Sequence, residues 1–132
     1  MDKEYNNWNK IKKEIAFDTI NVGFKNRDIF YINMGKNIGF EQDGKGVNFV
    51  RPVVVVKGFN KFMFLGIPLS TKIKEDKFYY NFKFNKKDEI VENIALLSQI
   101  RLFSTKRLLN KIGMMNIDDF NKMKNKFKDL ID

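Results

Sequence analysis

The feature that most constrains the fold of this chain is a succession of short β-type segments joined by short connections. These segments are rich in β-branched and aromatic residues, and turn-forming residues separate them. Strands that follow one another through short turns favour antiparallel pairing over a parallel α/β sheet. The sequence therefore predicts a mainly β fold with helices, in the form of a small antiparallel barrel. The expected strands are 28–34, 53–57, 61–67, 78–84 and 94–102.

Several connections between these strands can be assigned from the sequence. Residues 58–60 are expected to form a tight hairpin turn, Pro68 to end the preceding strand, and residues 69–72 to form the next turn. A polar segment that carries three carboxylates has no spacing that suggests acid–base catalysis. It is expected to be a solvated loop, and the three residues are Asp88, Glu89 and Glu92.

Helical periodicity is confined to the two ends of the chain and one short stretch. Residues 4–16 have apolar positions three or four apart, which predicts an amphipathic helix within an N-terminal extension, 1–24, of a single domain whose core is 25–132. Residues 105–110 are expected to form a short helix. Asn116 can cap a C-terminal helix whose apolar stripe is Ile117, Phe120, Met123, Phe127 and Leu130.

Composition excludes several kinds of chemistry. The 132 residues include no Cys and no His, so disulfides, thiol nucleophiles and the usual general base are absent, and a zinc site is not expected. We expect no cofactor and no metal. The formal net charge of +9 indicates affinity for a polyanion such as a nucleic acid, for an anionic membrane or for an acidic partner protein. A basic protein without a polyanion partner remains an open alternative. No segment approaches the about 20 apolar residues of a membrane span, and the polar N-terminus does not resemble a signal peptide, so we expect a cytoplasmic protein.

One loop and the residue that follows it are candidates for phosphate binding. Residues 35–50 contain four glycines, with Lys36 and Lys45 between them, but their spacing matches neither a Walker loop nor a dinucleotide fingerprint. Such a long loop is often functional. Arg51 and Pro52 then lead into four valines, and we expect this arginine to lie at the rim of the β-core, where it could meet a phosphate.

Other polar residues lie at the expected strand ends and could share that rim. Arg51 and Arg101 could hold a phosphate through paired N–H donors, and Ser70 and Thr71 could donate hydroxyl hydrogen bonds. Gln99 can both donate and accept, as a base edge or a ribose hydroxyl requires. Ordinary surface pairing by Arg101 and simple turn stabilisation by the two hydroxyls remain open alternatives.

Four blocks of the sequence occur in an order typical of one family. They are RDIFYINMGKNIGFEQDGKG, RPVVVV, IPLST and LLSQIRLFSTKRLLNKIG, and they lie between about residue 25 and the C-terminus. They contain an N-x-G-x-E-Q loop, Arg-Pro before an apolar run, a Pro-x-Thr-like turn, and Gln-x-Arg followed by Arg-Leu. The chain resembles the PemK/MazF toxins of type II toxin–antitoxin systems.

The resemblance implies an SH3-like barrel that forms a homodimer and is blocked by a cognate antitoxin. It implies a metal-independent endoribonuclease that cuts single-stranded RNA (mRNA) to leave 2′,3′-cyclic phosphate and 5′-hydroxyl ends. By motif, Arg51 matches the catalytic arginine, Ser70 matches the threonine of the turn, and Thr71 lies beside it. The implied RNA-binding residues are Gln99, Arg101, Glu41, Gln42 and Lys45.

Two substitutions depart from the family pattern. Ser70 replaces a threonine but keeps the hydroxyl, whereas Ser98 stands where relatives often carry an acidic residue, so the residues do not identify a general base. Two other functions remain open, because fold alone does not settle activity. One is a non-catalytic toxin of the same fold that binds a protein such as DNA gyrase, and the other is a silent RNA-binding module.

Overall fold

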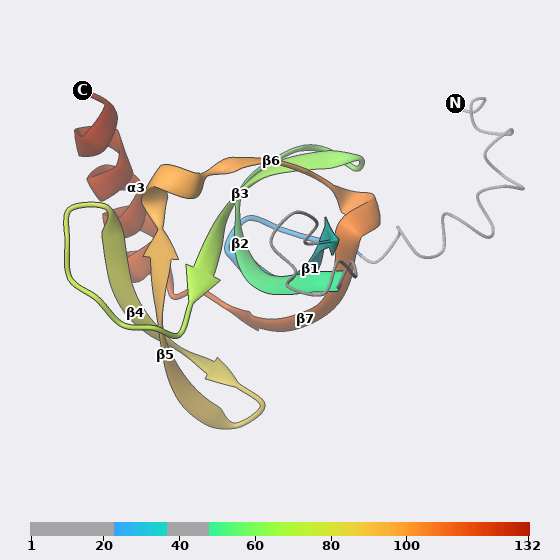
Figure 1. The fold of residues 1–132 in the computed structure, drawn as a ribbon, viewed down its shortest axis with the longest axis horizontal. Helices are drawn as coiled ribbons and strands as arrows, with labels where there is room; N and C mark the ends of the chain where they lie inside the picture. The colour runs from blue at the N-terminus through green and yellow to red at the C-terminus, as the bar shows by residue number, and fades with distance from the viewer. Residues whose placement is uncertain (1–22, 37–47) are drawn as a thin grey trace, which may run out of the picture.

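The computed structural model describes residues 23–36 and 48–132, which form a strongly curved β-sheet with one helix packed beside it (Figure 1). Neighbouring strands are antiparallel and follow the order β4-β5-β3-β2-β1-β7, with β6 paired to β3. The mainly β architecture is confirmed, but the ladder of described strands does not close into a ring, so the expected closed barrel is not shown. The elements are β1 (Asp28–Lys36), β2 (Asn48–Asn60), β3 (Met63–Ser70), β4 (Tyr79–Lys86), β5 (Glu89–Leu96), η2 (Leu97–Gln99), β6 (Arg101–Ser104), η3 (Thr105–Arg107), β7 (Leu108–Met114) and α3 (Ile117–Ile131).

Strand β2 is covered on both faces, which explains its continuous run of valines. Val53 and Val55 face one buried cluster and Val54 faces another, and all three side chains are fully buried. Because alternate side chains of a strand point to opposite faces, a strand with two covered faces needs no polar alternation. β2 is therefore the wall between two cores.

The two cores lie on opposite sides of this wall. The inner core lies inside the curl of β1, β2, β3, β6 and β7, and it consists of Phe30, Ile32, Val53, Val55, Phe64 and Phe103. The outer core lies between the curl, the β4–β5 hairpin and α3. Its residues are Ile29, Val54, Ile67, Leu69, Phe82, Phe84, Ala95, Leu97, Ile112, Met115, Phe120 and Met123.

The two ends of the sheet approach each other at one glycine. Phe84 of β4 packs against Gly113 of β7, where a Cβ atom would lie only 2.6 Å from Phe84 Cδ2. Any larger residue at this position would force β4 and β7 apart, which explains the glycine inside a strand.

The C-terminal helix is confirmed, together with its cap. The side-chain oxygen of Asn116 accepts hydrogen bonds from the backbone N–H groups of Asp118 (2.7 Å) and Asp119 (3.3 Å). Phe120 and Met123 are buried in the outer core, whereas Ile117, expected in the same stripe, is half exposed at 50%. The predicted N-terminal helix and most of the glycine loop fall on residues 1–22 and 37–47, outside the described residues.

The structure corrects three of the predicted boundaries. Pro68 does not end β3, which continues to Ser70, and the hairpin turn lies at residues 61–62 and not at 58–60. The carboxylates expected in a loop instead lie in the β4–β5 hairpin. Asp88 is in its turn with a positive φ of 65°, and Glu89 and Glu92 are in β5.

Two predictions near the C-terminus were wrong. The expected strand 94–102 is divided between β5 and β6 by the short 3-10 helix η2, because the chain crosses along β3 there. The expected helix 105–110 is only one 3-10 turn, η3, followed by β7, which pairs with β1. Within these residues Leu108 packs against the inner core, and that packing outweighs local helix propensity.

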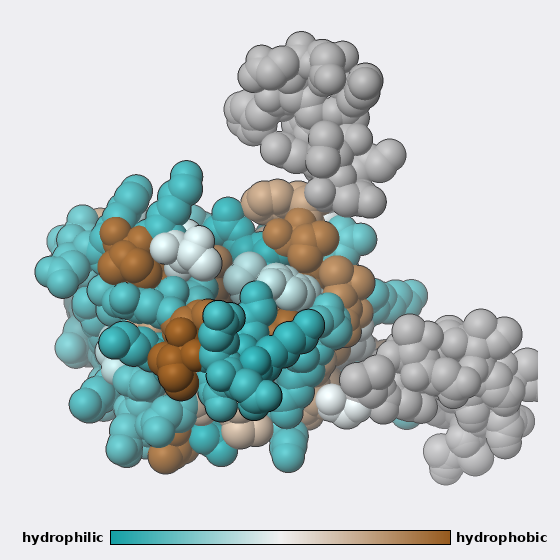
Figure 2. Space-filling view, turned by 90° about the horizontal axis from the view of Figure 1, so that it is seen from below, coloured by the Kyte–Doolittle hydropathy of each residue, from teal (hydrophilic) through white to brown (hydrophobic). Residues whose placement is uncertain are grey.

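One face of the molecule is the one seen from below with respect to the view of Figure 1. Figure 2 shows that face as mostly hydrophilic, with separate hydrophobic patches. Among the described residues, no helix has the length and apolar character needed to cross a membrane.

Candidate functional site

Strands β2 and β3 separate at one point, and both prolines of the chain flank it. Their paired register ends at Val53 opposite Pro68, after which β3 pairs with β5 through Leu69 and Ser70. Proline cannot donate a ladder hydrogen bond, so it suits positions where pairing stops. We call this separation the β2–β3 fork, formed by Arg51 and Pro52 on β2 and by Ser70 and Thr71 at the end of β3.

Arg51 is anchored in β2 and directed to the inner-core side of the fork. It lies opposite Ile32 of β1, two residues before Val53, so its side chain leaves on the same face as that buried valine. The side chain is half-buried, and the guanidinium carbon lies 5.1 Å from the centroid of the Phe49 ring. A cation–π contact of this kind orients the guanidinium while its N–H donors remain able to bind an anion.

Ser70 shares that side of the fork, whereas Thr71 does not. Ser70 lies two residues after Pro68, and by alternation along β3 it points to the face of Phe64 in the inner core. Its Oγ accepts a hydrogen bond from the Lys72 backbone N–H at 3.1 Å, so its own hydroxyl hydrogen remains available for donation. Thr71 is exposed and lines a small pocket on the opposite, outer-core side together with Pro52.

Gln99 and Arg101 lie together on the other edge of β3. Arg101 is opposite Gly66, its side chain is exposed, and its guanidinium carbon is 4.9 Å from the Phe103 ring centroid. Gln99 is exposed in η2, two residues before it. Four residue steps along β3, or about 13 Å of strand, separate Gly66 from Ser70. The described members of the predicted site thus form two groups, one at the fork and one on the other edge of β3.

The remaining predicted RNA-binding residues have no described position. Glu41, Gln42 and Lys45 all fall within 37–47, outside the part of the chain that the structure describes. Their roles remain predictions from the resemblance.

Arg107 lies at the same end of β1 as Arg51 and was not among the predicted site residues. Its Nη1 donates a hydrogen bond to the backbone oxygen of Asn33 at 3.1 Å. Ile32 of β1 pairs with Arg51 on one side and with Leu108, the residue after Arg107, on the other. Two strand spacings, about 10 Å, therefore separate the backbone of Arg51 from that of Leu108. The sequence signal was present in the Arg-Leu pair after the Gln-x-Arg block.

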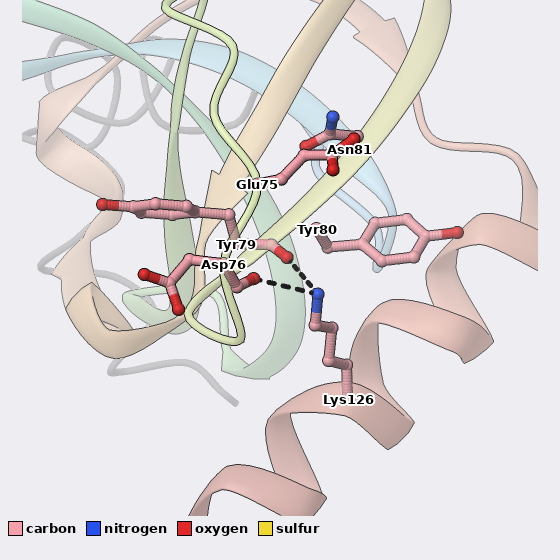
Figure 3. A pocket seen from close by; sticks show the side chains of 6 residues that line it. All are labelled: Glu75, Asp76, Tyr79, Tyr80, Asn81 and Lys126. Atoms are coloured by element: carbon pink, nitrogen blue, oxygen red, sulfur yellow. Dashed lines mark hydrogen bonds between the residues drawn. The ribbon is translucent and has the colours of Figure 1, made fainter.

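A second hollow, of about 430 Å³, lies between α3 and the start of β4 (Figure 3). Lys126 of α3 donates hydrogen bonds to the backbone oxygens of Asp76 (3.2 Å) and Tyr79 (2.5 Å). Tyr80 points toward the helix and donates to Asp119 at 2.7 Å. The pKa of the Tyr80 hydroxyl is raised above its usual range, mainly because the group is buried and to a smaller extent because the Asp119 carboxylate lies beside it. These contacts attach the helix to the sheet, so we interpret the hollow as structural.

Metal ligation has no evident location in the described residues. Within 23–36 and 48–132, no three carboxylates gather in a way that could hold an ion. The described side chains at the fork include a guanidinium and two hydroxyls, which can bind and stabilise anionic oxygen atoms.

Comparisons with known proteins agree with the resemblance in the sequence. A family model described as PemK-like, MazF-like toxin of type II toxin–antitoxin system matches residues 25–131. MazF (form I) from Deinococcus radiodurans has a TM-score of 0.62 and 16% identity, covering 82% of this chain and 96% of that chain. The Mycobacterium tuberculosis toxin MazF-mt6 has a TM-score of 0.58 and 11% identity, covering 78% and 94%. At these identities the likeness concerns the fold. No curated protein matches the chain significantly.

Proposed function

The chain belongs to the PemK-like, MazF-like toxins of type II toxin–antitoxin systems, and we propose that it is a sequence-specific, metal-independent endoribonuclease acting on single-stranded RNA. The observation that carries this proposal is the placement of Arg51 and Ser70 on one side of the β2–β3 fork. A guanidinium and a hydroxyl there can donate to the same phosphoryl group. The absence of His and Cys from the whole sequence fits a mechanism built on these donors.

The proposed reaction is internal transfer at phosphorus. The ribose O2′ attacks the adjacent phosphorus, the bond from phosphorus to O5′ breaks, and the products are a 2′,3′-cyclic phosphate and a 5′-hydroxyl. One proton leaves the 2′-hydroxyl and one reaches O5′. Arg51 stabilises the charge that develops on the non-bridging oxygens, and Ser70 donates a second hydrogen bond. A single well-placed donor of this kind contributes about 10²–10³ in rate.

The proton acceptor is not assigned to a residue. Ser98, which is exposed, occupies the position before Gln99 where relatives often carry a carboxylate. An arginine has a very high pKa, which makes Arg51 a better electrostatic stabiliser than a proton donor.

We further propose that the protein acts in the cytoplasm as a homodimer and is neutralised by a cognate antitoxin that covers the RNA site. The family to which the chain belongs pairs with antitoxins. Gln99 and Arg101 extend the proposed RNA contact along β3, with Arg101 supplying an exposed charge for the phosphate backbone.

The test is cleavage of a long single-stranded RNA in EDTA by the wild-type protein, Arg51→Ala and Arg101→Ala, with mapping of both product ends. We expect discrete cuts with cyclic phosphate ends for the wild type and a loss of at least about 100-fold for Arg51→Ala. Arg101→Ala is the matched control, because it removes a guanidinium from the other edge of β3. It should raise KM more than it lowers kcat.

Other outcomes would select the rival functions. RNA binding without cleavage by the wild type would indicate a silent RNA-binding module. If the wild type neither binds nor cleaves RNA and captures DNA gyrase, the chain is a toxin that acts on a protein. Equal cleavage by the wild type and Arg51→Ala would show that the site assignment is wrong.

A further inference from the structure

A small pocket opens on the outer-core side of the β2–β3 fork. Its volume is about 160 Å³, below the roughly 300–1,000 Å³ of sites for whole small molecules. It is therefore suited to a group the size of one ring. The residues that matter for its chemistry are Tyr31, Pro52, Thr71, Phe84, Lys86 and Asn93.

The amide of Asn93 is the unusual group in this pocket. The residue is only 3% exposed, and its side-chain Oδ1 has no hydrogen-bond partner among the described residues. Buried amide oxygens in folded proteins nearly always accept a hydrogen bond, and an unpaired one is costly. Because Asn93 lines a pocket, a bound ligand that donates a hydrogen bond can satisfy this group.

A positioned cation lies in the same pocket. Lys86 Nζ donates to the Tyr31 hydroxyl at 2.8 Å and lies 5.2 Å from the centroid of that ring. An ammonium group has three donors, so a ligand oxygen can be bound beside the tyrosine. Phe84 and Pro52 supply apolar wall, and Thr71 gives an exposed hydroxyl at the edge.

We propose that this pocket binds one unstacked nucleobase of the RNA and that Asn93 reads its hydrogen-bonding edge. An amide that donates and accepts, next to aromatic and apolar walls, is how proteins recognise single-stranded bases. The pocket adjoins the cleavage site, because Pro52 in its wall follows Arg51 directly and the β2–β3 pairing has ended there. Among the described residues no strand pairs with this edge of β2 before Val53, so RNA can pass over it from one side of the fork to the other. This inference rests on the proposed function for its substrate.

The test compares cleavage preferences of the wild type and Asn93→Leu, which has similar volume but no amide. Mapped cuts on a long RNA give the base preference at each position around the cleaved bond. We expect Asn93→Leu to reduce discrimination about tenfold or more at one position only, with the other positions unchanged. An unchanged preference everywhere, or an equal loss of cleavage at all sites, would overturn the proposal.

A second variant is needed because Asn93 is buried and Asn93→Leu could disturb folding. Thr71→Trp adds a ring at the exposed wall, where it should fill the pocket without disturbing the core, and it should weaken selection at the same single position. Urea unfolding of each variant establishes that it is folded. Weakened antitoxin binding with intact RNA preference would mean that the pocket docks protein and would refute base recognition.

Binding measurements separate this proposal from the proposed function. RNA heptamers in which each position is varied through the four bases, with a 2′-fluoro group in place of each 2′-hydroxyl to prevent cleavage, are titrated against the wild type and Asn93→Leu. A base preference that the variant loses supports the pocket even if the wild type never cuts RNA. The absence of any base preference in wild-type binding and cleavage overturns it.

Discussion

Two neighbouring hydroxyls at the end of β3 are directed to opposite sides, and this separates their expected roles. Ser70 is on the side of Arg51, and Thr71 is on the side of Pro52 and the small pocket. We predict that Ser70→Ala lowers kcat by about 100-fold, as expected for loss of one transition-state donor, while Thr71→Ala lowers it by less than about tenfold. Single-turnover cleavage of one RNA at saturating protein measures both.

The conservative variant Ser70→Thr provides the control for this prediction. It restores the residue type of the family's turn, so it should cleave within a few-fold of the wild type. If Thr71→Ala is the more damaging change, the assignment of the two faces of β3 is incorrect.

At the level of secondary-structure elements, the sequence predicted those with strong local signals. The strand beginning at Asp28 and the capped helix after Asn116 are confirmed, because periodicity and capping are local. β7 was missed because its leucines and lysine also suit a helix, and the outcome is decided by pairing with β1 and by packing of Leu108 against the inner core. The division between β5 and β6 was missed because the sequence there is one continuous apolar run. Its first part pairs with the end of β3 and its second part pairs with the beginning of β3.

The candidate site was only partly predictable for a related reason. The resemblance predicted roles for Arg51 and Ser70, and those roles stay predictions. Their shared face depends on alternation along strands whose registers the sequence does not show. Asn93 carried no signal, because it lies between a segment expected to be a solvated loop and the expected strand 94–102, and its burial becomes apparent only in the fold. Pro52 and Pro68 are the local signal in the sequence that indicates where the β2–β3 pairing ends, beside Arg51.

The seam between β1 and β7 depends on one buried carboxylate. Asp28 is 1% exposed, its Oδ2 accepts from the Lys25 backbone N–H at 2.8 Å, and its Oδ1 lies 3.1 Å from Lys111 Nζ. The contact with Lys111 is an ion pair, because Oδ1 accepts no hydrogen bond in the described residues. Lys111 is therefore the counter-ion of a charge that has little access to water.

Removal of the Lys111 charge alone should lower the free energy of unfolding more than removal of both the Lys111 and the Asp28 charges. We predict that Lys111→Met destabilises the protein by about 2 kcal/mol, because an uncompensated charge remains buried, with partial exposure of Lys111 limiting the loss. The double variant Lys111→Met with Asp28→Asn should recover about half of that. Urea unfolding midpoints at constant m-value measure both effects. A double variant less stable than Lys111→Met would contradict this interpretation.

For the whole molecule, the net charge would account for attraction to the proposed RNA substrate but not for the choice of the bond that is cut. The formal net charge of +9 predicts binding whose logarithm falls linearly with the logarithm of salt concentration, with a slope of about −0.7 for each phosphate contacted on a single strand. Cleavage by internal attack needs one particular hydroxyl in addition. Binding and chemistry can therefore be separated by changing a single atom of the substrate.

The nucleotide whose O2′ attacks its own 3′-phosphate can be replaced by its 2′-deoxy form. This change removes only the attacking O2′. We predict that affinity changes by no more than about twofold and keeps the same salt slope, since the phosphate contacts that dominate it are unchanged. Cleavage at that bond should become undetectable, while neighbouring preferred sites on the same strand are still cut. Cleavage that persists at the substituted position with a 3′-phosphate end would instead indicate attack by water, and Arg51 would then stabilise a different transition state.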